Sequence, residues 1–231
     1  MKRSNEPSTG FGGMPARAFT LLRSLEENNE SGWMREHRPS VIQDLRAPFI
    51  DYLEETTRRL REEGFDLRGG EETVFRMQRD LRFTADRRPF HEHVEAVFSK
   101  GGARIGTRAS IHVRLDRSGG FLRAGSFLQP AASLAALRES MMAREARFLE
   151  MASGLEAAGC PLVAERSLKR LPRGFEEAAD RPIAAYLRQV DPVAERPMRV
   201  EEWRDGSVIE ETLNFAQAVR PWLLFIEEAL V

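Results

Sequence analysis

The sequence contains very little cysteine, because Cys160 is the only one among 231 residues. A single cysteine excludes an intramolecular disulfide and a metal site built from several thiolates. Lysine is also scarce: only Lys2, Lys100 and Lys169 are present, and arginine supplies the rest of the basic charge. We attribute this bias to codon usage in a GC-rich genome rather than to function.

The chain also lacks a long hydrophobic run. The longest one near the C-terminus covers residues 222–226, whereas a helix needs about 20 apolar residues to cross a bilayer core. Residues 4–13 are polar and rich in Gly and Pro, unlike the hydrophobic part of a secretory signal. We therefore expect a soluble cytoplasmic protein with no membrane partner, in which residues 1–14 form a disordered tail and residues 15–231 a single domain.

Neither sign of charge is in excess, since 35 basic residues face 36 acidic ones. This balance argues against a general nucleic-acid or membrane coat, although a local basic patch is compatible with it. Hydrophobic residues make up 42% of the chain and charged residues 31%. A uniformly disordered chain has fewer apolar residues and a larger net charge, so the composition indicates a folded protein with a buried core.

The hydrophobic periodicity predicts helices at both ends of the chain and a sheet in the middle. Apolar residues follow a helical period at about residues 16–28, 40–64, 130–159 and 207–230, and residues 160–206 are interpreted as irregular. Between them the period changes to two, and the turn at 118–120 predicts an antiparallel hairpin. The predicted fold class is α+β, with a small antiparallel sheet at about residues 73–128 packed against the N- and C-terminal helices.

The first alternating segment contains an arginine among apolar residues. Phe75, Met77, Leu81 and Phe83 are predicted to form the buried face of a strand, and Arg79 shares their parity. An inward-pointing guanidinium needs partners for its donors. Because the neighbouring Asp80 has the opposite parity, the partner must be a helix acid (Glu26, Glu27 or Glu36) or backbone carbonyls, unless a bulge turns Arg79 outward into a cleft.

Basic charge concentrates in the same region. Residues 68–125 contain twelve basic and seven acidic residues, an excess of five. In an extended strand Arg76, Asp80 and Arg82 share one face, and a strand pairing alongside would bring His112 and Arg114 to it. Arginines held by carboxylates form a fixed receptor for anions. The same arrangement is also typical of a structural salt-bridge network, and the pattern alone leaves both interpretations open.

The histidines are the other candidates for chemistry. His91 and His93 are spaced as a metal pair on a strand, with Glu92, Asp86 or His112 as further ligands, but a transition-metal site needs three or four ligands. We therefore predict no bound metal. His93 alone can serve as a general acid or base, because imidazole titrates near neutrality, or it can simply hydrogen-bond a strand end. No glycine-rich nucleotide loop and no serine elbow is present, so no cofactor is predicted.

Three segments resemble a known family. Residues 79–86, followed by Pro89, Phe90 and His93, resemble the R-D-x-R-F-S-x-D-K-x-P-Y-K-x-H signature of the domain of unknown function 2461. Residues 22–37, with Asn28-Asn29 and Trp33, are similar to its N-N-x-x-W-F stretch, and residues 168–175 to its L-K-R-x-P-x-G-F-D segment. The resemblance covers about residues 18–230. It implies a single α+β domain of unknown activity and transfers no catalytic residue.

The sequence departs from this family pattern in four places. Arg87, Phe90 and His91 stand where the pattern has Lys, Tyr and Lys, and residues 179–182 lack the histidine that follows the third segment.

Two functions are compatible with these patterns. In the first, an arginine-rich cleft binds an anionic small molecule: Arg79, Arg82 and Lys169 hold the anion, Asp80 orients the arginines, and His93 is the acid or base of any reaction. The candidate ligand-binding residues are Arg79, Asp80, Arg82, Asp86, His112, Arg114 and Lys169.

In the second, the same basic face docks a protein or nucleic acid without catalysis. Base stacking is disfavoured, because few aromatic residues are interleaved with the basic ones. A concave pocket enclosing Arg82 and His93 would favour the first function, and a flat basic face the second. The patterns do not predict an oligomeric state.

Overall fold

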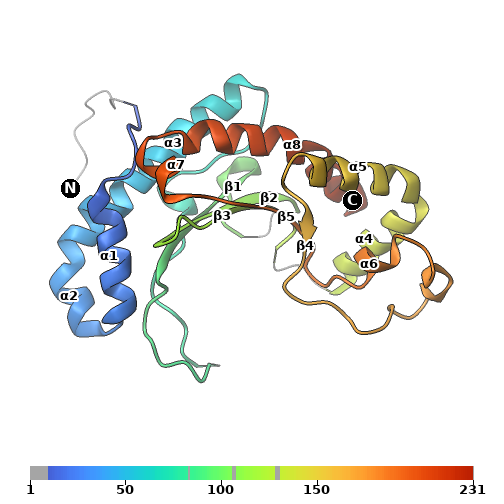
Figure 1. Ribbon diagram of the computed structural model, residues 1–231, viewed down its shortest axis with the longest axis horizontal. Coiled ribbons are helices and arrows are strands. Elements are labelled where there is room, and N and C mark those ends of the chain that lie inside the picture. The colour runs from blue at the N-terminus through green and yellow to red at the C-terminus, as the bar shows by residue number, and fades with distance from the viewer. Residues whose placement is uncertain (1–9, 83, 106–107, 128–130, 231) are drawn as a thin grey trace.

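The computed structural model describes residues 10–82, 84–105, 108–127 and 131–230 (Figure 1). Phe83, Leu128 and Pro130, which belonged to predicted elements, therefore lie outside the described residues, as do residues 1–9 of the predicted tail. Met14, which we placed in that tail, is buried, and its N–H donates a hydrogen bond of 2.7 Å to the carbonyl of Trp203. The packed structure therefore extends N-terminal to residue 15.

Helices occupy both ends of the chain, as predicted. The α-helices are α1 (Ala16–Glu27), α2 (Ser31–Ser40), α3 (Ala47–Glu62), α4 (Ala131–Ala143), α5 (Glu145–Ala157), α6 (Ala184–Leu187), α7 (Val200–Arg204) and α8 (Val208–Ala229). A π-helical turn, η1 (Val41–Arg46), joins α2 to α3, and short 3-10 turns are η2 (Glu71–Thr73), η3 (Lys100–Gly102) and η4 (Glu176–Ala178). The helix predicted over 130–159 is two helices, because Arg144 leaves the helical conformation between α4 and α5.

A five-stranded antiparallel sheet lies at the centre of the molecule. Its strands are β1 (His93–Ser99), β2 (Ser110–Asp116), β3 (Phe121–Gly125), β4 (Leu162–Val163) and β5 (Val193–Pro197), in the order β1-β2-β3-β5-β4. The predicted hairpin is the β2–β3 pair. Its turn requires glycine, because Gly120 has φ +87° and a Cβ there would overlap the carbonyl oxygen of Arg114. The α+β prediction is confirmed, and β4 and β5 add strands in a region interpreted as irregular.

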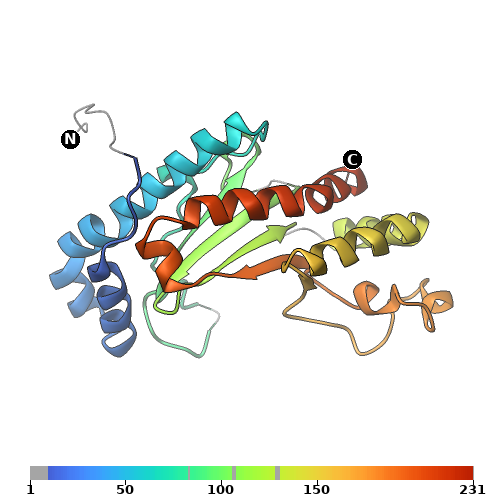
Figure 2. The same ribbon diagram turned by 45° about the horizontal axis from the view of Figure 1, so that its top comes forward.

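The main core fills one face of the sheet. Helices α3 and α8 cross this face (Figure 2), and alternate strand residues such as Ala96, Val113 and Leu122 are fully buried beneath them. Trp203 and Trp222 are also fully buried, and their indole N–H groups donate to the carbonyls of Gly119 (2.7 Å) and Ala124 (3.1 Å). Within the described chain, no helix is both long and apolar enough to cross a membrane.

The segment predicted as the first strand is instead an irregular arm, residues 74–92. It touches the sheet where Phe75 N–H donates to the Glu95 carbonyl (2.8 Å), and its two sides pair farther out around Gln78 and Phe90. Figure 1 shows the arm extending from the sheet on the side away from α8.

Apolar and polar residues alternate in the arm as predicted, but the apolar ones are not fully buried. Phe75, Met77 and Leu81 are half-buried while Arg76 and Gln78 are exposed. We attribute this to position, because beyond its first residues the arm projects away from the sheet and its core.

Candidate functional site

A pocket of about 870 Å³ opens on the face of the sheet opposite α3 and α8. The arm forms one side of it, and α4 with residues 165–166 and 190–192 forms another. Small-molecule sites usually measure about 300–1,000 Å³, so this pocket has the volume for an organic ligand.

Side-chain alternation explains why the floor of the pocket is polar. Successive strand residues point to opposite faces, so each strand that sends apolar residues into the core sends the residues between them into the pocket. The pairing aligns Glu95 with Arg114, and His112 with Arg123. Charged and aromatic side chains from three strands thus meet on one surface.

Glu95 is at the centre of this surface. Its carboxylate lies 3.1 Å from His112 Nδ1 and 3.3 Å from His93 Nε2, and it accepts a hydrogen bond of 2.9 Å from Arg114 Nη2. The Glu95 side chain is only 18% exposed. Burial alone would raise its pKa, but the hydrogen bonds from His112, His93 and Arg114 hold that pKa well below its usual range. Glu95 is therefore a fixed anion in the wall of the pocket.

Three histidines surround this anion. The rings of His91 and His93 lie 5.1 Å apart, and the ring of His112 stacks on Phe127 at 3.8 Å. Burial lowers the pKa of His91, and the neighbouring His93 and Arg79 lower it further. His93 also borders a second cavity, of about 220 Å³, beside Glu26, Glu92 and Asp116. In the described part of the chain, no group of three or more His, Cys, Asp or Glu side chains is placed to hold a metal ion.

The arginines of the pocket differ in how far they are already paired. Arg114 binds Glu95 through Nε and Nη2, and Arg123 pairs with Glu195 and with Glu165 at 2.6 Å. Both guanidinium groups also lie over the ring of Phe121, at 4.5 and 4.0 Å from its centre. Arg76 lines the pocket from the arm, is exposed, and forms no ion pair with the described residues. Its charge helps to lower the pKa of Asp80 from a distance.

The structure divides the predicted site residues into two sets. Asp80, His93, His112 and Arg114 line the pocket together. Arg79, Arg82, Asp86 and Lys169 are not among the described residues that line it: the first three lie in the arm, and Lys169 is exposed in a loop. Arg82 and Asp80 bind one another at 2.6 Å, which also lowers the pKa of Asp80. The prediction that the arm residues share a face with His112 and Arg114 therefore holds for Asp80 but not for Arg82.

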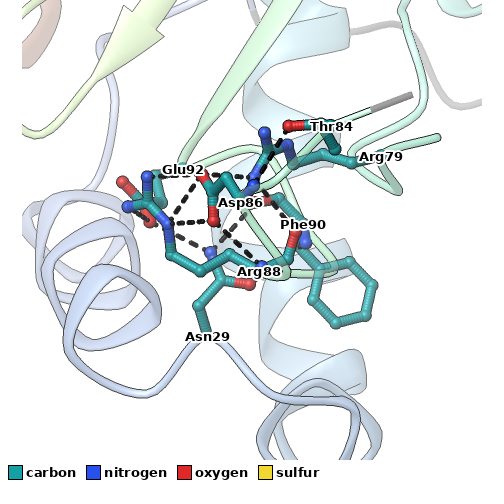
Figure 3. Close-up of polar contacts among 7 residues, drawn as sticks. All are labelled: Asn29, Arg79, Thr84, Asp86, Arg88, Phe90 and Glu92. Carbon is teal, nitrogen blue, oxygen red and sulfur yellow. Dashed lines mark hydrogen bonds and ion pairs between the residues drawn. The ribbon is translucent and has the colours of Figure 1, made fainter. Parts of the chain in front are cut away.

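The outer arm is held by its own ion pairs (Figure 3). Arg79 Nη1 donates to Asp86 at 2.7 Å and to the Arg88 carbonyl at 3.1 Å, and Arg88 also binds Asp86 (2.7 Å) and Glu92 (2.6 Å). Hydrogen bonds from Arg88 and then Arg79 lower the pKa of Asp86. The prediction that Arg79 is paired is confirmed, and so is a backbone carbonyl as one of its partners, but its acidic partner is Asp86 of the arm and not one of the helix acids proposed. The arm folds back on itself within nine residues, and this brings Asp86 and the Arg88 carbonyl next to Arg79.

Asn29 fixes the base of the arm. Its side chain binds both polar groups of the Phe90 backbone, accepting from N–H at 3.0 Å and donating to the carbonyl at 2.9 Å, and it also donates to Glu92 at 3.0 Å (Figure 3). These bonds join the loop between α1 and α2 to a segment 61 residues away. Asn29 is therefore positioned to orient the stretch that carries His91 and His93.

The chain matches the family model described as "Conserved hypothetical protein (DUF2461)" over residues 17–225. It belongs to this family. No curated protein and no solved structure matches the chain. In this DUF2461 protein the first two segments of the sequence resemblance meet, because Asn29 of one binds Phe90 of the other. The third, residues 168–175, follows Arg166 at the rim of the pocket.

Several pocket residues had escaped the sequence reasoning. These residues are Glu95, Phe121 and Arg123. Each alternates with core residues in a predicted strand, and this alternation was the signal in the sequence that could have found them. Only the register between the strands shows that they converge with His93 and His112.

Proposed function

We propose that the pocket on the open face of the sheet binds an anionic small molecule, with His93 as the acid or base of any reaction carried out on it. The observation that supports this most is Glu95, a carboxylate in the wall of a pocket of about 870 Å³, bound by two histidines and Arg114. A carboxylate whose pKa is strongly lowered by specific partners inside a cleft is typical of a functional site.

The proposed anion contacts are Arg76 and Arg114. Arg76 is unpaired among the described residues, and Arg114 has five N–H donors, of which Glu95 engages those on two nitrogens. They replace Arg79, Arg82 and Lys169, which lie outside the pocket.

The proposed role of His93 follows from its partner. A carboxylate that binds one ring nitrogen fixes the orientation of the imidazole. Glu95 does this from 3.3 Å at Nε2. His93 would then exchange a proton with a ligand that Arg76 and Arg114 hold in place.

The alternative, a basic face that docks a protein or nucleic acid, has less support. Three of the twelve basic residues at 68–125 line the concave pocket (Arg76, Arg114 and Arg123), and three form ion pairs within the arm (Arg79, Arg82 and Arg88).

The test is a thermal-shift and calorimetry screen of the full chain against anions of both kinds, small ones and ones with an organic body. A ligand at a hundred times its Kd stabilises a fold by about 2.7 kcal/mol. We expect at least one anion to raise the melting temperature, and Arg76→Gln to weaken its binding at least fivefold. Arg87→Gln, an exposed arginine of the same arm outside the pocket lining, should bind as the parent does. Equal losses in both variants, or no shift by any anion, would contradict the proposal.

A further inference from the structure

The pocket lining combines charged and apolar side chains. The charged surface of β1 and β2 forms its floor. The apolar residues come from the arm, from β3 and the residues after it, from α4 and from the residue that follows α8; they are Phe75, Phe121, Phe127, Leu134, Leu137 and Leu230. We propose that the ligand is an organic carboxylate or phosphate with an apolar body, so that it matches both parts of the lining. This inference rests on the proposed function and adds the class of ligand.

The charges of the pocket favour such a ligand over a small, highly charged one. Four arginines line it (Arg76, Arg114, Arg123 and Arg166), and four carboxylates offset them (Asp80, Glu95, Glu165 and Asp191). The lining is thus neutral apart from its histidines. A multiply charged ion would give up its hydration for little net attraction, whereas one anionic group can be held by the proposed contacts, Arg76 and Arg114.

The aromatic residues supply a surface for the apolar body. The His112 ring lies 5.7 Å from Phe75 and stacks on Phe127, and Phe121 carries the guanidinium groups of Arg114 and Arg123 over its face. Polar and aromatic groups are therefore in contact with each other at the floor of the pocket. Burying an apolar group against Leu134 and Leu137 removes apolar surface from water on both sides, which a small inorganic anion cannot do.

The experiment compares matched pairs by calorimetry on the full chain: acetate with phenylacetate, and inorganic phosphate with phenyl phosphate. We expect the aryl member of at least one pair to bind tenfold or more tightly than its small partner. The pair that shows the effect distinguishes a carboxylate from a phosphate head group. Benzyl alcohol, which keeps the ring and lacks the charge, should bind at least tenfold more weakly than the better aryl anion.

Two variants test whether the preference for the aryl compound arises in the pocket. Leu134→Asn changes a half-buried lining residue of α4 and should abolish the preference for the aryl member while small anions bind as before. Leu224→Asn changes a leucine of α8 that is 49% exposed and outside the lining, and should preserve the preference.

The outcomes separate the two proposals. Equal affinity within both pairs would overturn the inference and leave the proposed function standing. A preference for the aryl member that persists in Leu134→Asn would have the same consequence. Binding of benzyl alcohol as tight as that of the aryl anions would overturn the proposed function, because the charge would then contribute nothing. Absence of binding by every compound would overturn both.

Discussion

At the scale of single residues, Glu95 shows how the pocket stabilises a charge that is largely buried. Removing a carboxylate from water is costly unless hydrogen bonds and opposite charges replace the lost hydration. His93, His112 and Arg114 supply them from the same strand and its neighbour. Glu95 in turn orients the side chains of these three partners, because all of them bind the same carboxylate.

Glu95→Gln should destabilise the protein in a pH-dependent way. The pKa of Glu95 is lower in the folded protein than its ordinary value of 4.5, so the ionised form stabilises the fold at neutral pH. The contribution is present above about pH 4.5 and is lost progressively as the pH falls below it. We expect a loss of about 1.5–3 kcal/mol at pH 7, as for hydrogen bonds to charged groups, measured by urea denaturation.

The control for this prediction is Glu150→Gln, which changes an exposed carboxylate of α5. It should cost under about 0.5 kcal/mol at every pH. A Glu95→Gln loss that stays constant between pH 7 and pH 3 would contradict the ionised state of Glu95.

Arg79→Met should weaken the fold without affecting anion binding. The variant loses the bonds to Asp86 and the Arg88 carbonyl, but Asp86 keeps its ion pair with Arg88. Because Arg88 still neutralises Asp86, and Asp86 is 33% exposed to solvent, we expect a loss of about 1 kcal/mol. Urea denaturation measures the loss and calorimetry the binding. Arg87→Met is the matched control, and a change in anion affinity confined to Arg79→Met would show that Arg79 contacts the ligand.

Individual residues were only partly predictable from sequence. The alternation of polar and apolar residues placed His112 and Arg114 on one face, and the structure confirms this, because the pattern reports a local property of the backbone. The convergence of Glu95 with Arg114 depends on which residues pair across β1 and β2. That register is set by packing over the whole sheet, so spacing along the chain does not reveal it.

At the scale of elements, the arm is the feature that decides the shape of the site. Its inner part contributes Phe75, Arg76 and His91 to the pocket, while its outer part is tied together by Arg79, Asp86 and Arg88. The sequence predicted a strand here because the parity of 75–81 is that of a strand. A strand also needs continuous partners, and the arm has only isolated bridges.

Asn29→Ala should release the arm from the helices. The Phe90 N–H and carbonyl would both lose their partner, which costs about 1–3 kcal/mol for a partly buried amide. We expect faster tryptic cleavage after arginines of the arm such as Arg87, measured on native protein at neutral pH.

Asn28→Ala is the matched control for this change, because the Asn28 side chain only donates to the exposed carbonyl of Ser24. It should cost under about 0.5 kcal/mol and leave the cleavage rate of the arm unchanged. Equal cleavage rates for Asn29→Ala and the parent would show that other contacts hold the arm.

At the scale of the whole molecule, the class of fold was predictable and the pocket was not. The hydrophobic residues change from a helical period to a strand period and back along the chain. This is local information, and it predicts the α+β class. Strands β4 and β5 are short and preceded by prolines at 161 and 192, and β5 pairs with β3 while β4 pairs with β5, so their position depends on the rest of the sheet. The pocket likewise depends on distant segments, since its lining residues lie as far apart in the sequence as Phe75 and Leu230.

The buried tryptophans allow a test of the expectation that residues 15–231 form a single domain. Trp203 packs against Phe49 and Tyr52, and Trp222 against Phe148 and Phe225. Both belong to one continuous core, which also contains residues of α8 and the sheet. A continuous core favours one cooperative unfolding transition.

Two double variants report on the two ends of this core separately. Trp33→Phe with Trp222→Phe leaves Trp203 as the only tryptophan, and Trp33→Phe with Trp203→Phe leaves Trp222. In each variant, urea unfolding followed by fluorescence and by far-ultraviolet circular dichroism should give the same midpoint, because no part of the core unfolds without the rest. Comparing two probes within one variant removes the effect of the substitutions on stability. A fluorescence midpoint that departs from the dichroism midpoint in either variant would mean that the two ends unfold as separate units.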